Sequence, residues 1–437
     1  MVSAFLNAFR TPDLRKKILF TLGILVLLRL GSTIPTPNVN ASAIRSCATA
    51  ATTGESAGVY SMINMFSGGA LLHLSIFALG VMPYITSSII LQLLTVVIPR
   101  LETLKKEGGS GQQKITQYTR WLTIVLAVLQ ATSFTMLAVN GNLFTTCALD
   151  IVYSNGIFPI VVMILTMTAG TSIIMWFGEL ITDRGVGNGM SVIIFTQIAA
   201  RFPASMWNIR NGQNDPNRGL LVMLLVIAVG LLVMAGVVYV EQAQRRIPVQ
   251  YAKRMVGNRL LGGSSTYIPL KVNQAGVIPV IFASSILYLP VLFTMFSSTG
   301  KVAEWVSTNL ATGTGLWYNL IFFVLIIFFA YFYVSITFNP VEISDNMKKY
   351  GGFIPGIRAG KPTEDYLAYV LSRLTAPGAL YLGIISLIPS VPILLFNADQ
   401  NLPFGGTSLL IMVGVGLDTV KQIESQLHQR HYEGFLK

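Results

Sequence analysis

Charge is scarce in this 437-residue chain, because Asp, Glu, Lys and Arg together make up 11% of it, against about 25% in an ordinary soluble domain. Hydrophobic residues make up 53%, more than a soluble fold could hide from water. Runs such as 18–28, 220–240 and 316–338 approach or reach the roughly 20 apolar residues that cross a bilayer as a helix. The sequence therefore predicts a protein that lies mostly in the membrane.

Groups that do chemistry are also scarce. The three histidines, His73 near a span and His428 and His431 in the tail, have no metal-site spacing. No G-x-S-x-G, H-E-x-x-H or paired intramembrane Asp occurs. The glycines of 185–189 lack the context of a nucleotide site and indicate a tight turn between spans, and 360–361 lacks P-loop spacing. We therefore expect no catalytic residue, no metal and no cofactor.

The hydropathy pattern predicts ten spans in an all-α membrane protein, near 18–35, 72–98, 121–139, 157–181, 188–206, 219–240, 274–296, 317–338, 374–396 and 406–424. The first is interpreted as a retained span because no small-residue cleavage site follows it. Assigning loops alternately places 24 of the 30 Lys and Arg residues on one face. By the positive-inside rule both termini are cytoplasmic.

Two cysteines, Cys47 and Cys147, fall in loops assigned to the outer side, where a disulfide can persist. Nothing in one sequence shows whether they meet. A disulfide and two free thiols therefore both stay open.

Ten spans divide into five plus five, which places the second half in inverted topology. The approximate halves are 1–187 and 188–437, with a pseudo-repeat boundary near 210–218. The basic loops 241–273 and 339–373 are long, and long loops tend to carry function. Their Lys and Arg residues also fit the simpler roles of setting orientation and touching anionic lipid.

Residues 60–69 form a short apolar segment that ends in Gly68-Gly69 and cannot cross the bilayer. A broken helix at membrane depth is tolerated where it lines a cavity or is covered by protein. A half-helix lying at the outer surface is the equal alternative.

Ionisable residues are rare within the predicted spans, where a transporter for charged solutes would normally carry them. Arg29 lies toward the outer end of the first span, and Glu179 marks the inner end of the fourth. A secondary solute transporter with inverted repeats remains the alternative that hydropathy and the broken helix permit. An intramembrane enzyme would need a nucleophile or metal cluster that the sequence lacks.

Several motifs carry a family resemblance. Residues 67–94 (SGGALLHLSIFALGVMPYITSSIILQLL) and 176–194 (WFGELITDRGVGNGMSVII) are the longest, followed by 269–279 (PLKVNQAGVIP) and 404–411 (FGGTSLLI). Together with shorter matches at 244–247, 251–254, 338–340, 345–349 and 355–358, they span nearly the whole chain in order. The sequence closely resembles the SecY family, the channel subunits of the bacterial Sec translocon. The outer-loop residues 45–58 depart from the pattern.

The resemblance implies ten helices in two inverted, pseudo-symmetric five-helix halves around a central hourglass pore. A ring of apolar side chains would narrow that pore at mid-membrane, at Val81, Ile85, Met190, Ile194, Ile278, Ile281 and Ile411. Paired members are spaced i, i+3 or i+4 and so face one way. Without the resemblance the same residues would be interpreted as packing or lipid-facing.

The resemblance also assigns a plug and a lateral gate. The plug would be 60–69, with contributing residues Tyr60, Ile63, Asn64, Met65, Phe66 and Ser67 and the hinge Gly68 and Gly69. The gate to lipid would be lined by Thr86, Ser87, Ser88, Gln92, Gln130, Asn273 and Gln274. Taken singly, such polar residues more often make hydrogen bonds between helices.

The function implied is that of a protein-conducting channel in the plasma membrane, for secretion and for membrane-protein insertion. The family's partners are SecE, SecG, the SecA ATPase, the ribosome, signal peptides with the chains they lead, and membrane lipids. The basic loops suit rRNA and acidic protein surfaces. The candidate contacts are Arg245, Arg246, Lys253, Arg254, Lys348, Lys349 and Arg358, with Arg254 and Arg358 leading.

Overall fold

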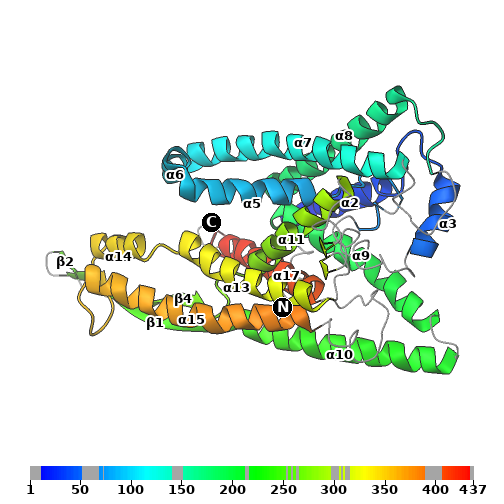
Figure 1. Cartoon of the computed structure of the whole chain (residues 1–437). Coiled ribbons are helices and arrows are strands. Elements are labelled where there is room, and N and C mark those ends of the chain that lie inside the picture. Colours follow the sequence, from blue (N-terminus) through cyan, green and yellow to red (C-terminus); the bar gives the residue numbers. More distant parts are fainter. Residues whose placement is uncertain are drawn as a thin grey trace.

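The structure, a computed structural model, is helical with a small sheet at one end (Figure 1). It describes residues 11–51, 68–71, 73–139, 151–211, 216–251, 254–256, 259–261, 265–296, 305–306, 309–310, 315–388 and 406–433.

Each predicted span corresponds to one helix. These are α2 (Pro12–Gly31), α5 (Met82–Val97), α7 (Gly109–Val139), α8 (Ile157–Arg184), α9 (Gly189–Asn211), α10 (Pro216–Gln242), α11 (Ile278–Phe296), α13 (Leu316–Thr337), α15 (Lys361–Leu387) and α17 (Gly406–Glu433). Within the described ranges, five helices are long and apolar enough to cross a membrane by themselves, and six if the pair α5 and α6 (Pro99–Lys106), bent by 101°, is one span. The prediction of a multi-span helical membrane protein is confirmed.

The second span begins later than predicted, at Met82 rather than at 72. The described residues from 73 to 81 form turns, and backbone bonds tie them to the chain that follows α2. Thr36 N donates to Leu74 O at 2.9 Å and Ile76 N to Ile34 O at 3.0 Å. A chain whose amides bond across to another segment cannot also bond within a helix. A hydropathy profile does not show whether backbone amides bond within a helix or to another segment.

α2 begins at Pro12 rather than near 18, and two other helices begin much earlier than predicted. α7 begins at Gly109 rather than near 121, and α15 at Lys361 rather than near 374. Both added segments are polar, so they continue a helix beyond the apolar stretch that hydropathy detects. The turn at 185–189 lies between α8 and α9, as expected.

The long loop 241–273 is a β-ribbon and not an irregular loop. β1 (Gln244–Tyr251) pairs antiparallel with β4 (Ser265–Lys271), and β2 (Arg254–Val256) pairs with β3 (Arg259–Leu261) at its tip. β5 (Gly352–Phe353), from the loop 339–373, adds to the other edge of β1. The two loops predicted to carry partner contacts therefore share one sheet.

The described residues form two large apolar cores and one small cluster, in which Leu14 and Ile18 of α2 meet Val186 and Ile423. The larger core unites residues of α2, α3, α5, α7, α8, α9, α10, α11, α13, α15 and α17 with the turns before α5. The second joins Ile247, Val249 and Leu270 of the ribbon to the ends of α13, α14 (Pro340–Lys349) and α15. In β1 the buried residues alternate with exposed ones, so one face of the ribbon rests on the helices.

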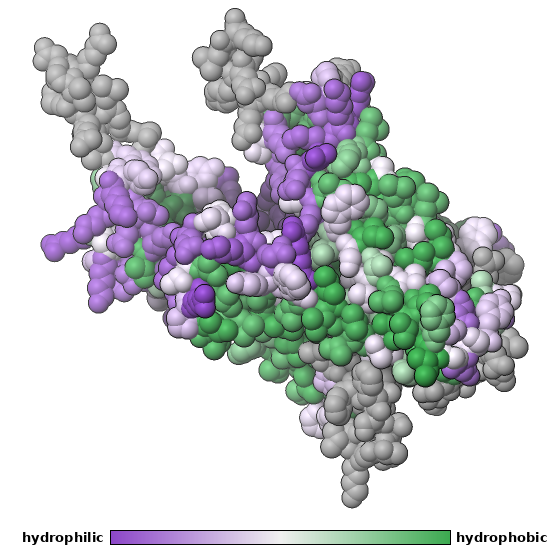
Figure 2. All heavy atoms as spheres, turned by 90° about the horizontal axis from the view of Figure 1, so that it is seen from above, coloured by the Kyte–Doolittle hydropathy of each residue, from purple (hydrophilic) through white to green (hydrophobic). Residues whose placement is uncertain are grey.

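The surface is that of a protein in lipid. All five tryptophans are at least 45% exposed: Trp121, Trp176, Trp207, Trp305 and Trp317. α10 exposes most of its apolar side chains, including Leu232 at 74%. In Figure 2 hydrophobic side chains cover much of the helical body, and hydrophilic ones gather toward one end. Water would disfavour such a surface, whereas hydrocarbon accepts it.

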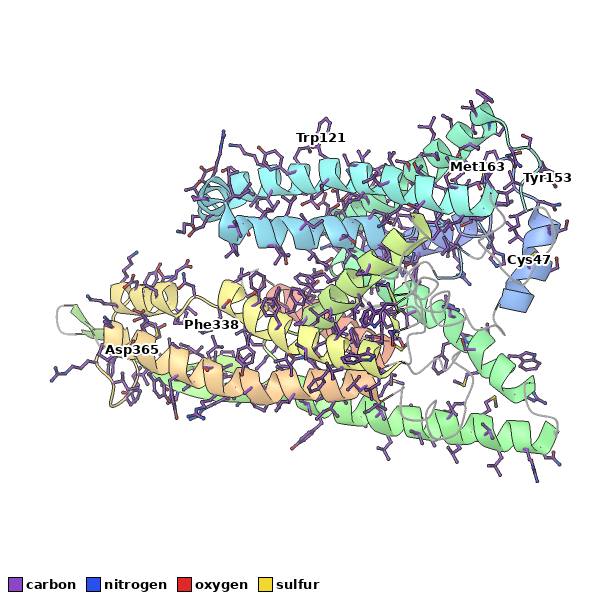
Figure 3. The ribbon with its side chains drawn as sticks, viewed as in Figure 1. Cys47, Trp121, Tyr153, Met163, Phe338 and Asp365 are labelled. Atoms are coloured by element: carbon purple, nitrogen blue, oxygen red, sulfur yellow. The ribbon has the colours of Figure 1, made fainter. Side chains whose placement is uncertain are left out.

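The loops sort to two ends. α6, α14 and the β-ribbon lie at one end of Figure 1, and α3 (Ala41–Ala51) lies at the other. Figure 3 shows the same division, with Cys47 and Tyr153 toward one end and Phe338 and Asp365 toward the other, while Trp121 points away from the body. Three of the segments that alternate assignment placed on the basic face, namely α6, α14 and the ribbon, thus lie at the same end.

Candidate channel core and cytoplasmic surface

The seven predicted ring positions lie in or against one apolar core. Five are buried within it, namely Val81, Ile85, Met190, Ile194 and Ile411, and Ile278 and Ile281 pack against it from the first turn of α11. Val81 N-caps α5, and Ile85 N donates to its carbonyl at 3.1 Å, so the pair stands one turn apart. Met190 is also close to α8, because a side chain at Gly178 would collide with its sulfur. Four helices thus bring the positions to the same core.

The two glycines of the predicted hinge have backbone angles that favour glycine. Gly68 and Gly69 have φ values of 64° and 95°, a region that side chains disfavour. The Gly68 carbonyl accepts a hydrogen bond of 2.9 Å from Arg29 Nη1 on α2. A Cβ on Gly68 would come within 3.2 Å of Gln197 on α9. The remaining predicted plug residues, Tyr60, Ile63, Asn64, Met65, Phe66 and Ser67, lie outside the described residues.

The helices of the predicted lateral gate touch one another. α5 packs on α7, and α11 contacts both. Ser87 and Thr86 are buried and donate to carbonyls of their own helix, Pro83 O at 2.8 Å and Met82 O at 2.9 Å. Gln130 is buried on α7, Ser88 is partly buried and Gln92 is exposed. Their role at a gate stays a prediction.

Asn273 and Gln274 are not at the start of a helix, as the span 274–296 implied. α11 begins at Ile278, and the two residues lie in the link that joins it to β4. Asn273 Nδ2 donates to Glu241 Oε1 at 2.6 Å, and Gln274 Oε1 accepts from Lys271 N at 3.2 Å. The apolar hydropathy window overlapped this link because Ala275, Val277 and Ile278 follow directly.

The predicted partner contacts lie on the sheet and beside it. Arg245 and Arg246 are exposed on β1, where Arg246 stacks over Tyr267 at 4.9 Å. Lys348 and Lys349 are exposed in the last turn of α14, whose N-cap Asn339 accepts from Val341 N at 3.2 Å. Arg358 is exposed between β5 and α15. Arg254 begins β2, and Lys253 lies outside the described residues.

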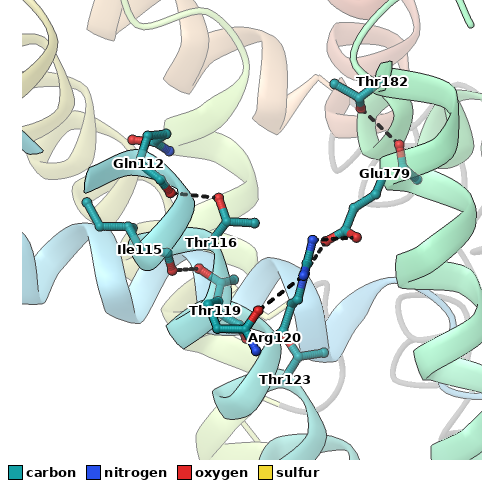
Figure 4. Close-up of polar contacts among 10 residues, drawn as sticks. Gln112, Ile115, Thr116, Thr119, Arg120, Thr123, Glu179 and Thr182 are labelled. Atoms are coloured by element: carbon teal, nitrogen blue, oxygen red, sulfur yellow. Dashed lines mark hydrogen bonds and ion pairs between the residues drawn. The ribbon is translucent and has the colours of Figure 1, made fainter. Parts of the chain in front are cut away.

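Three charged groups on helices have partners that sequence reasoning did not find. Arg120 on α7 forms a bidentate ion pair with Glu179 on α8, at 2.7 and 2.9 Å (Figure 4). Glu241, at the end of α10, is 7% exposed and bound by Asn273. Arg29 on α2 binds the Gly68 carbonyl. All three contacts join residues at least 32 positions apart, so no local pattern announces them.

The structure decides between a disulfide and a free thiol for one of the two cysteines. Cys47, fully buried on α3, is disulfide-bonded. Cys147, the other cysteine of the chain, lies outside the described residues. Among the residues that the structure describes, no group of three or more His, Cys, Asp or Glu side chains could hold a metal ion.

These features define a class, a polytopic helical membrane protein with one central apolar core and a basic sheet at one end. The SecY family model matches residues 75–420. Over the full length of both chains, this chain is 62% identical to the protein translocase subunit SecY of Streptomyces scabiei and 60% identical to that of Mycobacterium tuberculosis. The chain belongs to the SecY family.

Solved structures share the fold. A protein-conducting channel matches 94% of this chain and 91% of its own, with a TM-score of 0.62 at 18% identity. Sec61 in a canine ribosome-channel complex from the endoplasmic reticulum matches the same shares, with a TM-score of 0.57 at 16% identity. The relatives are translocase subunits and not solute carriers, which favours the channel over the transporter that hydropathy left open.

Proposed function

We propose that this chain is the channel subunit of a protein translocase in the plasma membrane. It passes unfolded polypeptides across the bilayer and releases apolar segments sideways into lipid. The observation that carries the proposal is the single apolar core that receives all seven ring positions, in a chain 62% identical to a translocase subunit over its full length. The chain itself performs no catalysis.

The ring works by dewetting. Apolar side chains around a narrow passage exclude ions and water, yet they yield to an extended polypeptide because they offer it no fixed partner. Residues 60–69 form the plug of the resting pore, and Gly68 and Gly69 give its base the backbone freedom to move. Arg29 holds that base through the Gly68 carbonyl.

The lateral gate sorts its cargo by partitioning between α5, α7 and α11. A segment gains roughly 0.3–0.6 kcal/mol for each Leu-like residue that enters lipid, and one central charge costs about 2.5–3.5 kcal/mol. A sufficiently apolar segment therefore leaves sideways, and a polar one continues across. The polar side chains along these helices ease the passage of polar groups.

Energy comes from partners, since no nucleotide motif occurs in the sequence. SecE and SecG complete the membrane complex, and the SecA ATPase or a translating ribosome drives transport from the cytoplasmic side. Both termini and the basic sheet face that side by the positive-inside rule. Arg245, Arg246, Arg254, Lys348, Lys349 and Arg358 offer cations to acidic protein surfaces or rRNA.

Site-specific crosslinking tests the ring. A photoprobe at Ile85 or Ile281 should attach to a secretory chain stalled in transit, because both positions would line its path. A matched probe at Leu232, an exposed apolar residue of α10, should label lipid instead. Attachment to the stalled chain from Leu232 but not from the ring positions would sink the proposed path.

Charge reversal tests the cytoplasmic surface. Arg358→Glu should reduce export by about tenfold while the folded channel stays in the membrane, because a repulsive charge would face an acidic partner. Lys105→Glu makes the same change on the exposed elbow α6 and serves as control. Uptake of a precursor into vesicles that is unchanged by Arg358→Glu would remove this residue from the contact surface.

A further inference from the structure

The link between β4 and α11 is the non-helical path from the basic sheet to the ring. Leu270 and Ala275 belong to the second core, while Val280, a few residues on, is fully buried in the larger one. α13 and α15 also run through both cores, but as continuous helices. This link therefore joins the ribbon directly to the turn of α11 that carries Ile278 and Ile281.

A buried carboxylate fixes the link. Glu241 Oε1 accepts from Asn273 Nδ2 at 2.6 Å, and the same amide donates to Gly276 O at 3.1 Å. Gly276 has a φ of 61°, so the chain reverses sharply just before α11. One side chain of α10 thus sets the shape of the turn that starts α11.

Neighbouring contacts leave the link little freedom. Val272 N donates to Ala243 O at 3.0 Å, which closes the base of the ribbon. On α15, Gly378 lies so close that a Cβ there would meet the Val272 carbonyl at 2.5 Å. Lys271 Nζ lies 3.9 Å from Asp418 Oδ1 on α17. Three helices and the ribbon therefore converge on one short segment.

A contribution to folding stability does not by itself explain why a carboxyl group occupies the buried position of Glu241. Burying a charge is costly, and well-packed apolar residues usually serve a core at least as well. The charged groups acting on Glu241 are Lys271 and Lys421, of opposite sign, and Asp418, of like sign. A short, directional bond to Asn273 fixes the position of the link in a way that apolar contact does not.

We propose that Glu241 is a positioning residue that couples the basic sheet to α11. Through Asn273 it carries movement of the ribbon, when a cytoplasmic partner binds, to Ile278 and Ile281 of the ring. The inference rests on the proposed function, since it assumes that the sheet binds the driving partner and that α11 borders the pore.

The test separates partner binding from transport. The full chain, with its partner subunits, is reconstituted in vesicles, and two quantities are measured: the Kd of the driving ATPase and the rate of precursor uptake. Glu241→Ala and Asn273→Ala should leave the Kd within about twofold and lower uptake about tenfold or more, the size expected for a lost bond to a charged group.

Companion variants define the bond. Glu241→Gln keeps an accepting oxygen and should retain uptake within about twofold. The double variant Glu241→Ala with Asn273→Ala should fall no further than Asn273→Ala alone, because that variant already removes the contact with Glu241. Thr375→Ala is the control, since it removes a buried hydroxyl that bonds only within α15.

Each outcome is decisive. Unchanged uptake in the alanine variants, or a Kd that weakens as much as uptake falls, would overturn the coupling role. Should the alanine variants be missing from the membrane, Glu241→Asp keeps the charge on a shorter side chain, and it must lower uptake at unchanged Kd or the inference fails. Wild-type vesicles that take up no precursor would instead contradict the proposed function itself.

Discussion

At the scale of single residues, several polar side chains bind backbone carbonyls of non-helical segments. Arg29 binds the carbonyl of Gly68, Asn273 binds that of Gly276, and Thr36 Oγ1 donates to Leu74 O at 2.8 Å. Each of these carbonyls lies where the chain is not helical, and Leu74 O also accepts from Thr36 N at 2.9 Å. In a water-poor interior such a group must be satisfied from elsewhere.

Arg29→Ala should loosen the base of the plug. The lost bond from a charged donor is worth about 1.5 kcal/mol, which corresponds to roughly tenfold more time in the released state. Resting vesicles should therefore conduct ions more readily, as measured by planar-bilayer recording.

The control for this prediction is Arg15→Ala, which removes a charge from an exposed position on the same helix. It should leave the resting conductance unchanged. If Arg29→Ala behaves like the control, the hinge is held by other contacts.

At the scale of elements, helices are joined by specific pairs as well as by apolar packing. The bidentate pair of Arg120 and Glu179 fixes α7 against α8, and the ribbon rests on α13 and α15 through Ile247 and Val249. In lipid, packing and polar contacts replace the hydrophobic drive that associates helices in water. We therefore expect α7 to move with α8, and the ribbon to move with α13 and α15.

Arg120→Ala should lower the melting temperature of the purified complex, because the partly buried carboxyl group of Glu179 would lose both of its hydrogen bonds from Arg120. We expect a loss of about 1–2 kcal/mol, above that of an exposed pair, and Arg120→Lys should not restore it since lysine cannot bind in bidentate fashion. Thermal unfolding in detergent measures the change.

Two comparisons sharpen this result. The swapped pair Arg120→Glu with Glu179→Arg should recover part of the loss. Lys106→Ala, which breaks the exposed pair with Glu102, should change nothing measurable. Equal melting temperatures for Arg120→Ala and Lys106→Ala would show that the Arg120–Glu179 pair contributes no more stability than an exposed ion pair.

Ile247→Asp should release the ribbon from the helices, because it places a charge in the second core where the native side chain is 2% exposed. Trypsin should then cleave at Arg245 and Arg246 at least about tenfold faster, since local opening limits access. Pro248→Asp changes the neighbouring residue on the exposed face of the same strand and should leave the cleavage rate as it is.

At the scale of the whole molecule, the two ends differ in chemistry. The basic loops, the sheet, α6 and α14 gather at one end, and α3 with Tyr153 lies at the other. Between them the helical body exposes tryptophan and leucine to its surroundings. This is the arrangement that orientation by positive charge produces.

The orientation is testable by labelling. In intact cells, a membrane-impermeant thiol reagent should modify Tyr153→Cys, at a site 71% exposed at the α3 end, and should spare Lys348→Cys at the sheet end. Inverted vesicles should give the reverse pattern. Labelling of Lys348→Cys from outside intact cells would contradict cytoplasmic placement of the sheet.

Hydropathy placed each of its ten spans on a helix, yet it misplaced the starts of α2, α5, α7, α11 and α15. It reports how much apolar chain is present and not where backbone bonds begin. The ring positions came from motif resemblance, and the structure brings all seven to one core. The plug segment lies outside the described residues, and the gate and ring roles remain predictions.

The sequence by itself determined that the chain crosses the membrane repeatedly and which loops share a face, because apolar length and loop charge are local properties. Only the tertiary structure decided that the two long loops form one sheet, that Glu241 holds Asn273 and that Arg29 holds Gly68. Those contacts join residues far apart in sequence, and their geometry exists only once the helices have packed.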